Sequence, residues 1–421
     1  MIFKRARYLQ SLIDGRGNGL VKIVTGVRRS GKSFLLFNLW HGWLTANGAD
    51  ESHIIELQLD DRANRRLRDP DILLDYIGSR LPKDGQPCYV ILDEVQLIDD
   101  FVEVILSLTH IRDANVDVYV SGSNSRFLSS DVATEFRGRG SEIRVWPLSF
   151  AEYYGGVGGS IRDAWNDYYT FGGLPQVAQL KDADAKIGYL KGLYETTYLR
   201  DVIDRNRLRN ADGLRELVHV LASGIGSLTN ARRIANTFKS TRSSISMKPE
   251  TIKGYIDCLK DAFLIEEAMR YDVKGRRYIG AEAKYYFADV GLRAAILDFR
   301  QQEEPHIMEN IIYNELRYRG YSVDVGIVET WSKTADGKSA RTPLEMDFVA
   351  NRPPRRYYIQ SAFRMSTPEK EAQEHRPLLS VNDHFRKMVI VGDDIHRKED
   401  GHGILTMGIL DFLVDDSVMK E

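Results

Sequence analysis

Apolar runs and amphipathic stretches alternate along the first 150 residues. Residues 21–24 and 89–92 are apolar at almost every position, which is typical of parallel strands covered on both faces. Between them, residues 34–40 space their apolar side chains as a helix does. Further strands are predicted at 53–59, 116–120 and 143–146. Strands that alternate with helices predict an α/β parallel sheet, and we place this core domain at residues 1–150.

Helical periodicity takes over after residue 164 and lasts to about residue 265. Leu228-Thr229-Asn230 caps one predicted helix, and a second begins at residues 248–251. A strand-like ribbon follows over residues 266–289, with its turn at Lys274-Gly275-Arg276-Arg277. Short helices followed by a β-ribbon are the pattern of a winged helix, which we place at residues 211–290.

The last part of the chain, from about residue 291, predicts another α/β unit. A helix is expected at 309–316, and strands are expected at 323–328, 346–350 and 357–360. Residues 332–342 are polar and predict a mobile loop between the first two of these strands.

Composition and charge narrow the possible functions. Of the 421 residues, 43% are hydrophobic and 28% are charged, with a net charge of −2, which is typical of a soluble protein of two to four domains. Any nucleic-acid binding would need local basic patches. Cys88 and Cys258 form no CxxC pattern, so neither a disulfide framework nor a zinc site is predicted. No signal peptide and no apolar run of about 18–20 residues is present, so we expect a cytoplasmic protein without a membrane span.

Residues 26–33 fit the pattern GxxxxGK[ST] of a phosphate-binding loop. An apolar strand precedes them and an amphipathic helix follows, which distinguishes such a loop from a chance glycine turn. Its main-chain N–H groups and the helix N-terminus attract phosphate. Lys32 is predicted to contact the β- and γ-phosphates of ATP, and Ser33 is predicted to ligate Mg²⁺. The predicted nucleotide-binding residues of this loop are Gly26, Val27, Arg28, Arg29, Ser30, Gly31, Lys32, Ser33 and Phe34.

The strand at residues 89–92 ends in two acids, Asp93 and Glu94. An acid at the carboxyl end of a parallel strand lies where α/β proteins bind ligands. Asp93 is predicted to hold Mg²⁺, and Glu94 to orient and deprotonate the attacking water. An acidic turn after a buried strand is the alternative, and the paired phosphate loop argues against it.

Three further residues are candidates for the catalytic set. Asn124 follows the fourth strand and could touch the γ-phosphate or the water, and an Asx turn explains it equally well. Arg137 and Arg139 flank a glycine, and one of them could act as an arginine finger on a neighbouring subunit's γ-phosphate. Two alternatives to a finger remain open for these arginines: they belong to a solvated basic loop, or they make a contact within the same chain.

At these motifs the chain resembles the prokaryotic AAA+-related P-loop ATPases of the signal-transduction and archaeal-ATPase branch. The resemblance is to the subgroup with a C-terminal domain of unknown function, and it runs nearly end to end. The matching segments are residues 25–33, 92–96, 121–125, 137–139, 147–150, 171–175, 286–292, 309–310, 345–348 and 358–360.

This resemblance implies an AAA+/ASCE core, a helical lid at residues 151–210, a winged helix, and a C-terminal domain at residues 291–421 similar to PD-(D/E)xK nucleases. It also implies that Pro175 packs near the nucleotide base. In the nuclease-like domain, Glu309, Asp347 and Gln360 match the metal-ligand positions. Ala362 stands where a working nuclease has lysine, so we expect this domain to be catalytically inactive.

Basic residues near the predicted winged helix make double-stranded DNA a candidate partner. They are Arg232, Arg233, Lys239, Arg242, Lys248, Lys274, Arg276 and Arg277. The alternatives are a solvated helical surface and a winged helix that contacts another protein.

The sequence thus predicts an ATPase that hydrolyses ATP with Mg²⁺ and couples this to conformational change or assembly. A finger from a second subunit would require a homo-oligomer. Two alternatives remain open: a nucleotide-gated DNA-binding switch with little turnover, and an ATP-dependent nuclease.

Overall fold

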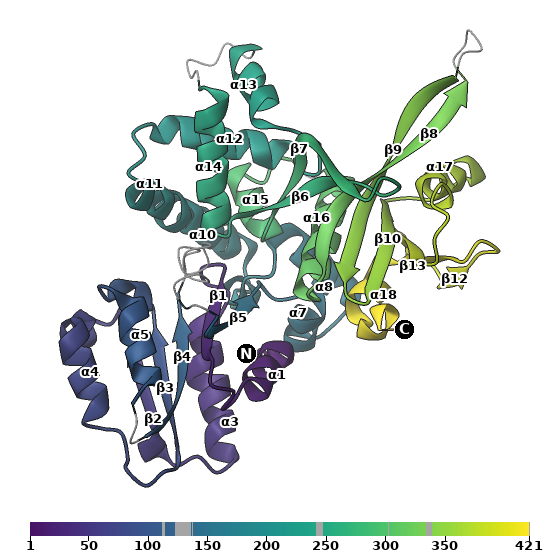
Figure 1. Cartoon of the computed structure of the whole chain (residues 1–421). Coiled ribbons are helices and arrows are strands. Elements are labelled where there is room, and N and C mark those ends of the chain that lie inside the picture. Colours follow the sequence, from purple (N-terminus) through teal and green to yellow (C-terminus); the bar gives the residue numbers. More distant parts are fainter. Residues whose placement is uncertain are drawn as a thin grey trace. The chain divides into compact units, whose positions relative to one another are not determined.

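The computed structural model describes residues 1–111, 114–122, 136, 138–240, 247–301, 303–333 and 339–420. The chain forms two compact units (Figure 1). The first comprises Met1–Leu148 with Asp261–Phe263, and the second comprises Ser149–Lys260 with Leu264–Glu421.

A five-stranded parallel sheet forms the centre of the first unit, in the order β2-β3-β4-β1-β5. This confirms the predicted α/β core. The strands are β1 (Val21–Gly26), β2 (Ile54–Gln58), β3 (Pro87–Asp93), β4 (Asn115–Ser121) and β5 (Gly140–Val145). The helices are α1 (Ala6–Asp14), α2 (Lys32–Phe34), α3 (His41–Ala46), α4 (Pro70–Gly78) and α5 (Phe101–Thr109). A π-helical segment (Leu35–Trp40) joins α2 to α3, and 3₁₀ turns lie at Glu51–His53, Arg62–Arg68 and Val95–Leu97.

Both faces of this sheet are covered, as its apolar strands require. On one face Val90 and Leu92 pack with Leu73 of α4 and Ile105 of α5. On the other face the ring centroids of Trp40 and Tyr119 lie 5.0 Å apart, and Tyr89 packs edge-on against Trp40. The carboxyl ends of β1, β3 and β4 therefore lie together at one edge of a closely packed sheet.

The second unit begins with helices. Ser149 caps α7 in a capping box with Glu152, which explains why a helix starts directly after residue 149. The helices are α7 (Phe150–Val157), α8 (Ile161–Phe171), α9 (Pro175–Gln179), α10 (Ala183–Leu193), α11 (Arg200–Asn206), α12 (Ala211–Ser223), α13 (Ala231–Ser240), α14 (Pro249–Asp261), α15 (Val290–Ile296), α16 (Glu304–Tyr318), α17 (Pro368–Leu379) and α18 (Ile409–Val414). A π-helical segment (Tyr194–Leu199) links α10 to α11, and a 3₁₀ turn lies at Asp416–Met419.

An eight-stranded mixed sheet completes this unit, in the order β12-β13-β11-β10-β9-β8-β6-β7. Its strands are β6 (Ile265–Asp272), β7 (Arg277–Phe287), β8 (Ser322–Lys333), β9 (Ser339–Arg352), β10 (Arg355–Ala362), β11 (Arg386–Val391), β12 (Lys398–Glu399) and β13 (Ile404–Gly408). The predicted ribbon is β6–β7, and β6 pairs in parallel with β8. The ribbon is therefore part of the C-terminal sheet. This sheet contains strands from both sides of residue 290, where the end of the winged-helix domain was expected.

The prediction of a loop at residues 332–342 is wrong at both ends of this range. Backbone pairing of β8 with β9 continues to Lys333 and Ser339, and the hairpin extends away from the rest of the sheet (Figure 1). Ladder hydrogen bonds join main-chain groups, so polar side chains do not prevent two strands from continuing to pair.

The described helices include none that is both long and apolar enough to cross a membrane.

Candidate nucleotide-binding site

The loop between β1 and α2 requires glycine at its first position. Gly26 has φ 126°, and a Cβ there would lie 2.0 Å from the carbonyl oxygen of Val145 on the paired strand β5. Gly31 has φ 94° just before α2, and Arg29 between them has φ 65°. These left-handed conformations turn the chain tightly enough for main-chain N–H groups to face a bound anion.

The Lys32 side chain folds back over this loop. Its Nζ donates to the carbonyl oxygens of Gly26 and Val27, at 3.1 Å each, and the residue is 5% exposed. Burial lowers the pKa of Lys32 to about 8, against the opposing charges of Glu94 and Asp93. The loop therefore holds an ammonium group that lacks a full counter-charge.

Asp93 ends β3 and is 3% exposed. Its carboxylate accepts a hydrogen bond from Ser121 Oγ at the end of β4 and another from the Ser33 side chain. Burial raises the pKa of Asp93, while these two hydrogen bonds lower it. Direct side-chain contacts thus join the ends of β3 and β4 to Ser33 of α2, which follows the loop after β1. Ser121 is a member of the site that the sequence did not single out.

Glu94 follows in a left-handed conformation, with φ 55°. This turn directs the chain away from the sheet and leaves the Glu94 side chain half-buried, where it accepts a hydrogen bond from Gln96 Nε2. Its charge acts on Lys32 more strongly than that of Asp93 does. The structure therefore brings Lys32, Asp93 and Glu94 to the same edge of the sheet.

The other predicted residues of the loop differ in exposure. Val27 and Ser30 are buried, Arg28 is half-buried, and Arg29 and Phe34 are exposed. Ser30 Oγ is buried without a hydrogen-bond partner within the described part of the chain. Asn124 and Arg137 lie outside the described residues.

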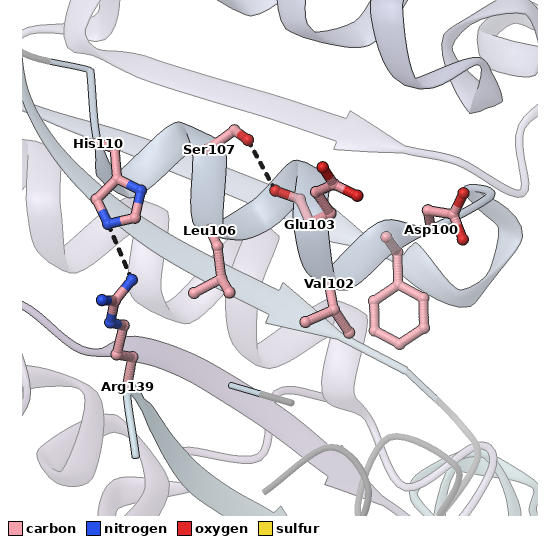
Figure 2. Close-up of a pocket in the computed structure, with 8 residues that line it drawn as sticks. Asp100, Val102, Glu103, Leu106, Ser107, His110 and Arg139 are labelled. Carbon is pink, nitrogen blue, oxygen red and sulfur yellow. Dashed lines mark hydrogen bonds between the residues drawn. The ribbon is translucent and has the colours of Figure 1, made fainter. Parts of the chain in front are cut away.

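Arg139 lies beside the start of β1, at the opposite end of this strand from the phosphate-binding loop. Its carbonyl oxygen accepts a hydrogen bond from the N–H of Val21, at 2.8 Å, and Gly26 is five residues further along β1, about 16 Å away. A contact between Arg139 and the phosphate of its own chain is therefore excluded. Arg139 Nη1 lies 2.9 Å from His110 Nε2. Figure 2 shows this contact beside a pocket lined mainly by residues of α5.

Pro175 belongs to the second unit and begins α9. The glycines before it are fixed by a buried carboxyl group: Asp289 accepts the N–H groups of Gly173 and Leu292, at 2.7 and 3.0 Å. A Cβ on Gly172 would lie 2.2 Å from Asp289 Oδ1. Burial raises the pKa of Asp289 to about 6. Packing of Pro175 near the nucleotide base stays a prediction.

The residues expected in the nuclease-like domain lie on different elements of the second unit. Glu309 is on α16, Asp347 on β9 and Gln360 on β10. Ala362 ends β10, so the lysine position of the motif carries no ammonium group, but Lys284 of β7 supplies one from elsewhere, 2.8 Å from Glu309 and 3.5 Å from Asp347. No sequence motif marked Lys284, because it precedes Glu309 by 25 residues and belongs to the ribbon.

Several of the basic residues near the ribbon have partners. Arg233 pairs with Glu282 at 2.9 Å, and Lys274 Nζ donates to the carbonyl oxygen of Glu329. Arg277 lies 3.8 Å from Asp272. The other described members, Arg232, Lys239, Lys248 and Arg276, are exposed, and Arg242 lies outside the described residues.

The parallel sheet of the first unit and this loop are those of a P-loop domain. A family model described as an AAA domain matches residues 18–154, and one described as a domain of unknown function (DUF8612) matches residues 162–303. The chain belongs to the same family as an uncharacterized protein of Haemophilus influenzae. That protein is 30% identical over 418 residues, which cover 98% of this chain and 99% of the relative. The AAA-type core predicted from the sequence is confirmed.

More distant similarities are also found. The uncharacterized protein MJ1544 of Methanocaldococcus jannaschii is 26% identical over 72% of this chain and 67% of its own length. Among solved structures, the ORC2 protein of Aeropyrum pernix is 11% identical over 70% of this chain and 91% of its own, with a TM-score of 0.39.

The lowered pKa of Lys32 predicts that ATP binds more weakly at high pH. Phosphate pairs with the charged ammonium, so above pH 8 binding must take up a proton. We expect the dissociation constant for ATP, measured by calorimetry, to rise roughly 20- to 30-fold between pH 7.5 and 9.5. Lys32→Arg, whose guanidinium does not titrate in this range, should bind with a flat profile. A flat profile in the unmodified protein would contradict the prediction.

Proposed function

We propose that this protein binds ATP and Mg²⁺ at the loop of residues 26–33 and hydrolyses ATP to ADP and phosphate. The observation that carries the proposal is the meeting of Lys32, Asp93 and Glu94 at one edge of the parallel sheet. An ammonium, a metal-binding carboxylate and a base are the groups that nucleotide hydrolysis needs. The further proposal is that hydrolysis drives a conformational or assembly change.

Each residue has a distinct role in this reaction. Lys32 leaves the carbonyl oxygens of Gly26 and Val27 and pairs with the β- and γ-phosphates. Glu94 accepts a proton from water as the water oxygen attacks the γ-phosphorus. The bond from the γ-phosphorus to the bridging oxygen then breaks, and ADP leaves with that oxygen.

The residues present also fit a magnesium ion. Ser33 and Asp93 are already hydrogen-bonded to each other, and a hydroxyl with a carboxylate is the oxygen donor set that Mg²⁺ prefers. When bound, Mg²⁺ would neutralise charge on the phosphates. Ser121 holds the Asp93 carboxylate in place for this purpose.

Phosphate release from ATP tests the proposal. The purified chain with ATP and Mg²⁺ should release phosphate, and Lys32→Ala should not. Lys83→Ala, which removes an exposed lysine between α4 and β3, is the matched control and should behave as the unmodified chain does. Equal release by the unmodified chain and Lys32→Ala would trace the activity to another site or a contaminant.

We also propose that Arg139 acts on the nucleotide of a neighbouring subunit in a homo-oligomer. Its exposed side chain and its distance from its own loop support this arrangement. Mixing Lys32→Ala subunits with Arg139→Ala subunits should restore part of the activity, because some interfaces then combine an intact loop with an intact arginine. Absence of any rescue in confirmed mixed oligomers would remove Arg139 from this role. Arg137→Ala is the parallel variant.

Double-stranded DNA remains a proposed partner through the exposed basic residues Arg232, Lys239 and Lys248. Their charges are the feature that favours it. Phosphate release should change on addition of duplex DNA, and the change should disappear when all three are replaced by alanine. An unchanged rate, with no duplex binding at low salt, would argue against DNA.

A further inference from the structure

A buried ammonium group lies at the centre of three carboxylates in the second unit. Lys284 Nζ of β7 is 2.8 Å from Glu309 Oε1 of α16 and 2.8 Å from Glu345 Oε1 of β9. Asp347 Oδ1 of β9 is 3.5 Å away. The Lys284 side chain is 3% exposed, those of Glu309 and Asp347 are 10% and 12% exposed, and that of Glu345 at the rim is 38% exposed.

Protein groups also occupy the outer sides of this cluster. Tyr286 OH donates to Glu309 Oε1 at 2.6 Å, and the N–H of Ser361 donates to Asp347 Oδ2 at 2.8 Å. Burial would lower the pKa of Lys284, but the charges of the three acids outweigh it and raise that pKa. These charges therefore favour the protonated form of Lys284.

The arrangement has the form of a cation site that holds a lysine. Carboxylates from a helix and a strand converge on one point, as they do around Mg²⁺. An ammonium has three N–H donors, and here Glu309 accepts a hydrogen bond from it while Glu345 and Asp347 form ion pairs with it. Across the described part of the chain, no group of three or more His, Cys, Asp or Glu side chains is arranged to hold a metal ion.

We propose that Lys284 is a built-in cation that takes the place of a divalent metal among Glu309, Glu345 and Asp347, so that the C-terminal sheet assembles around a lysine and binds no metal there. The ammonium links ribbon strand β7 to α16 and β9. It thereby fixes the ribbon to the C-terminal sheet without any metal. Under this proposal the cluster does not cleave nucleic acid, because the ammonium occupies the position that a catalytic metal ion would need.

Titration of the nucleotide-free full-length chain with Mn²⁺ alone, followed by calorimetry, tests the proposal. The unmodified chain should show no binding that depends on Asp347. Lys284→Ala should gain one Mn²⁺ site, because three acids then surround a vacant cation position. Asp347→Asn added to Lys284→Ala should remove that site again, which distinguishes it from any binding at Asp93. Without metal, Lys284→Ala should melt roughly 10 °C lower than the unmodified chain, and Mn²⁺ should recover part of this loss.

Two results would overturn the proposal. The first is Mn²⁺ binding by the unmodified chain that Asp347→Asn abolishes, since the cluster would then hold a metal beside the lysine. The second is a folded Lys284→Ala that takes up no Mn²⁺ at millimolar concentration. Lys284→Gln provides the same test with a smaller cavity if the alanine variant does not fold, and the comparison of unmodified chain with Asp347→Asn needs neither variant.

Discussion

Glu94→Gln is expected to slow phosphate release at least about 100-fold while the affinity for ATP stays nearly unchanged. Glutamine keeps the shape of the side chain and can still contact Gln96, but it cannot accept the proton of the attacking water. The ATP-bound form of the variant should therefore accumulate. Release assays with labelled ATP, together with calorimetry on the same preparation, measure both quantities.

Glu369→Gln is the matched control for this substitution. It makes the same chemical change at an exposed position in the first turn of α17 and should leave hydrolysis as it is. Full turnover by Glu94→Gln would show that another group handles the proton. Loss of ATP binding in the same variant would instead indicate that Glu94 holds the nucleotide.

Gly26→Ala is expected to destabilise the first unit by roughly 3–5 kcal/mol and to abolish ATP binding. The new Cβ would lie 2.0 Å from the carbonyl oxygen of Val145, and φ at this position is 126°. Strands β1 and β5 would have to separate, and the loop that carries Lys32 would move with β1. Denaturant unfolding gives the stability change, and ATP titration gives the binding.

Gly42→Ala serves as the control for this substitution. Gly42 is exposed in α3 and a Cβ there meets no atom within 4 Å, so alanine should be neutral or stabilising by about 0.5–1 kcal/mol. Normal ATP binding by Gly26→Ala, with unfolding unchanged, would contradict the close packing of β1 against β5 as the feature that shapes the loop.

The sequence predicts the nucleotide site well because its signals are local. The strand before Gly26, the loop itself and the helix after it are contiguous, and the two acids directly follow a buried strand. Parallel strands then bring their carboxyl ends to one edge. Ser121 could have been singled out on the same ground, because it ends the strand that lies between β1 and β3.

The features that the sequence does not predict depend on contacts between distant segments. Pairing of β6 with β8 joins residues about 55 positions apart. The sequence of neither strand indicates which other strand it pairs with. Lys284 appears as one basic residue in a ribbon until α16 and β9 surround it with acids. The hairpin of β8 and β9 extends through polar residues because its stability comes from main-chain pairing.

Calorimetric titration of the folded, purified chain with ATP in the presence of Mg²⁺ tests the central claim most directly. The arrangement of Lys32, Ser33 and Asp93 predicts one saturable site per chain, lost in Lys32→Ala. If neither ATP nor any other purine triphosphate binds to the folded chain under these conditions, the nucleotide site described above is wrong.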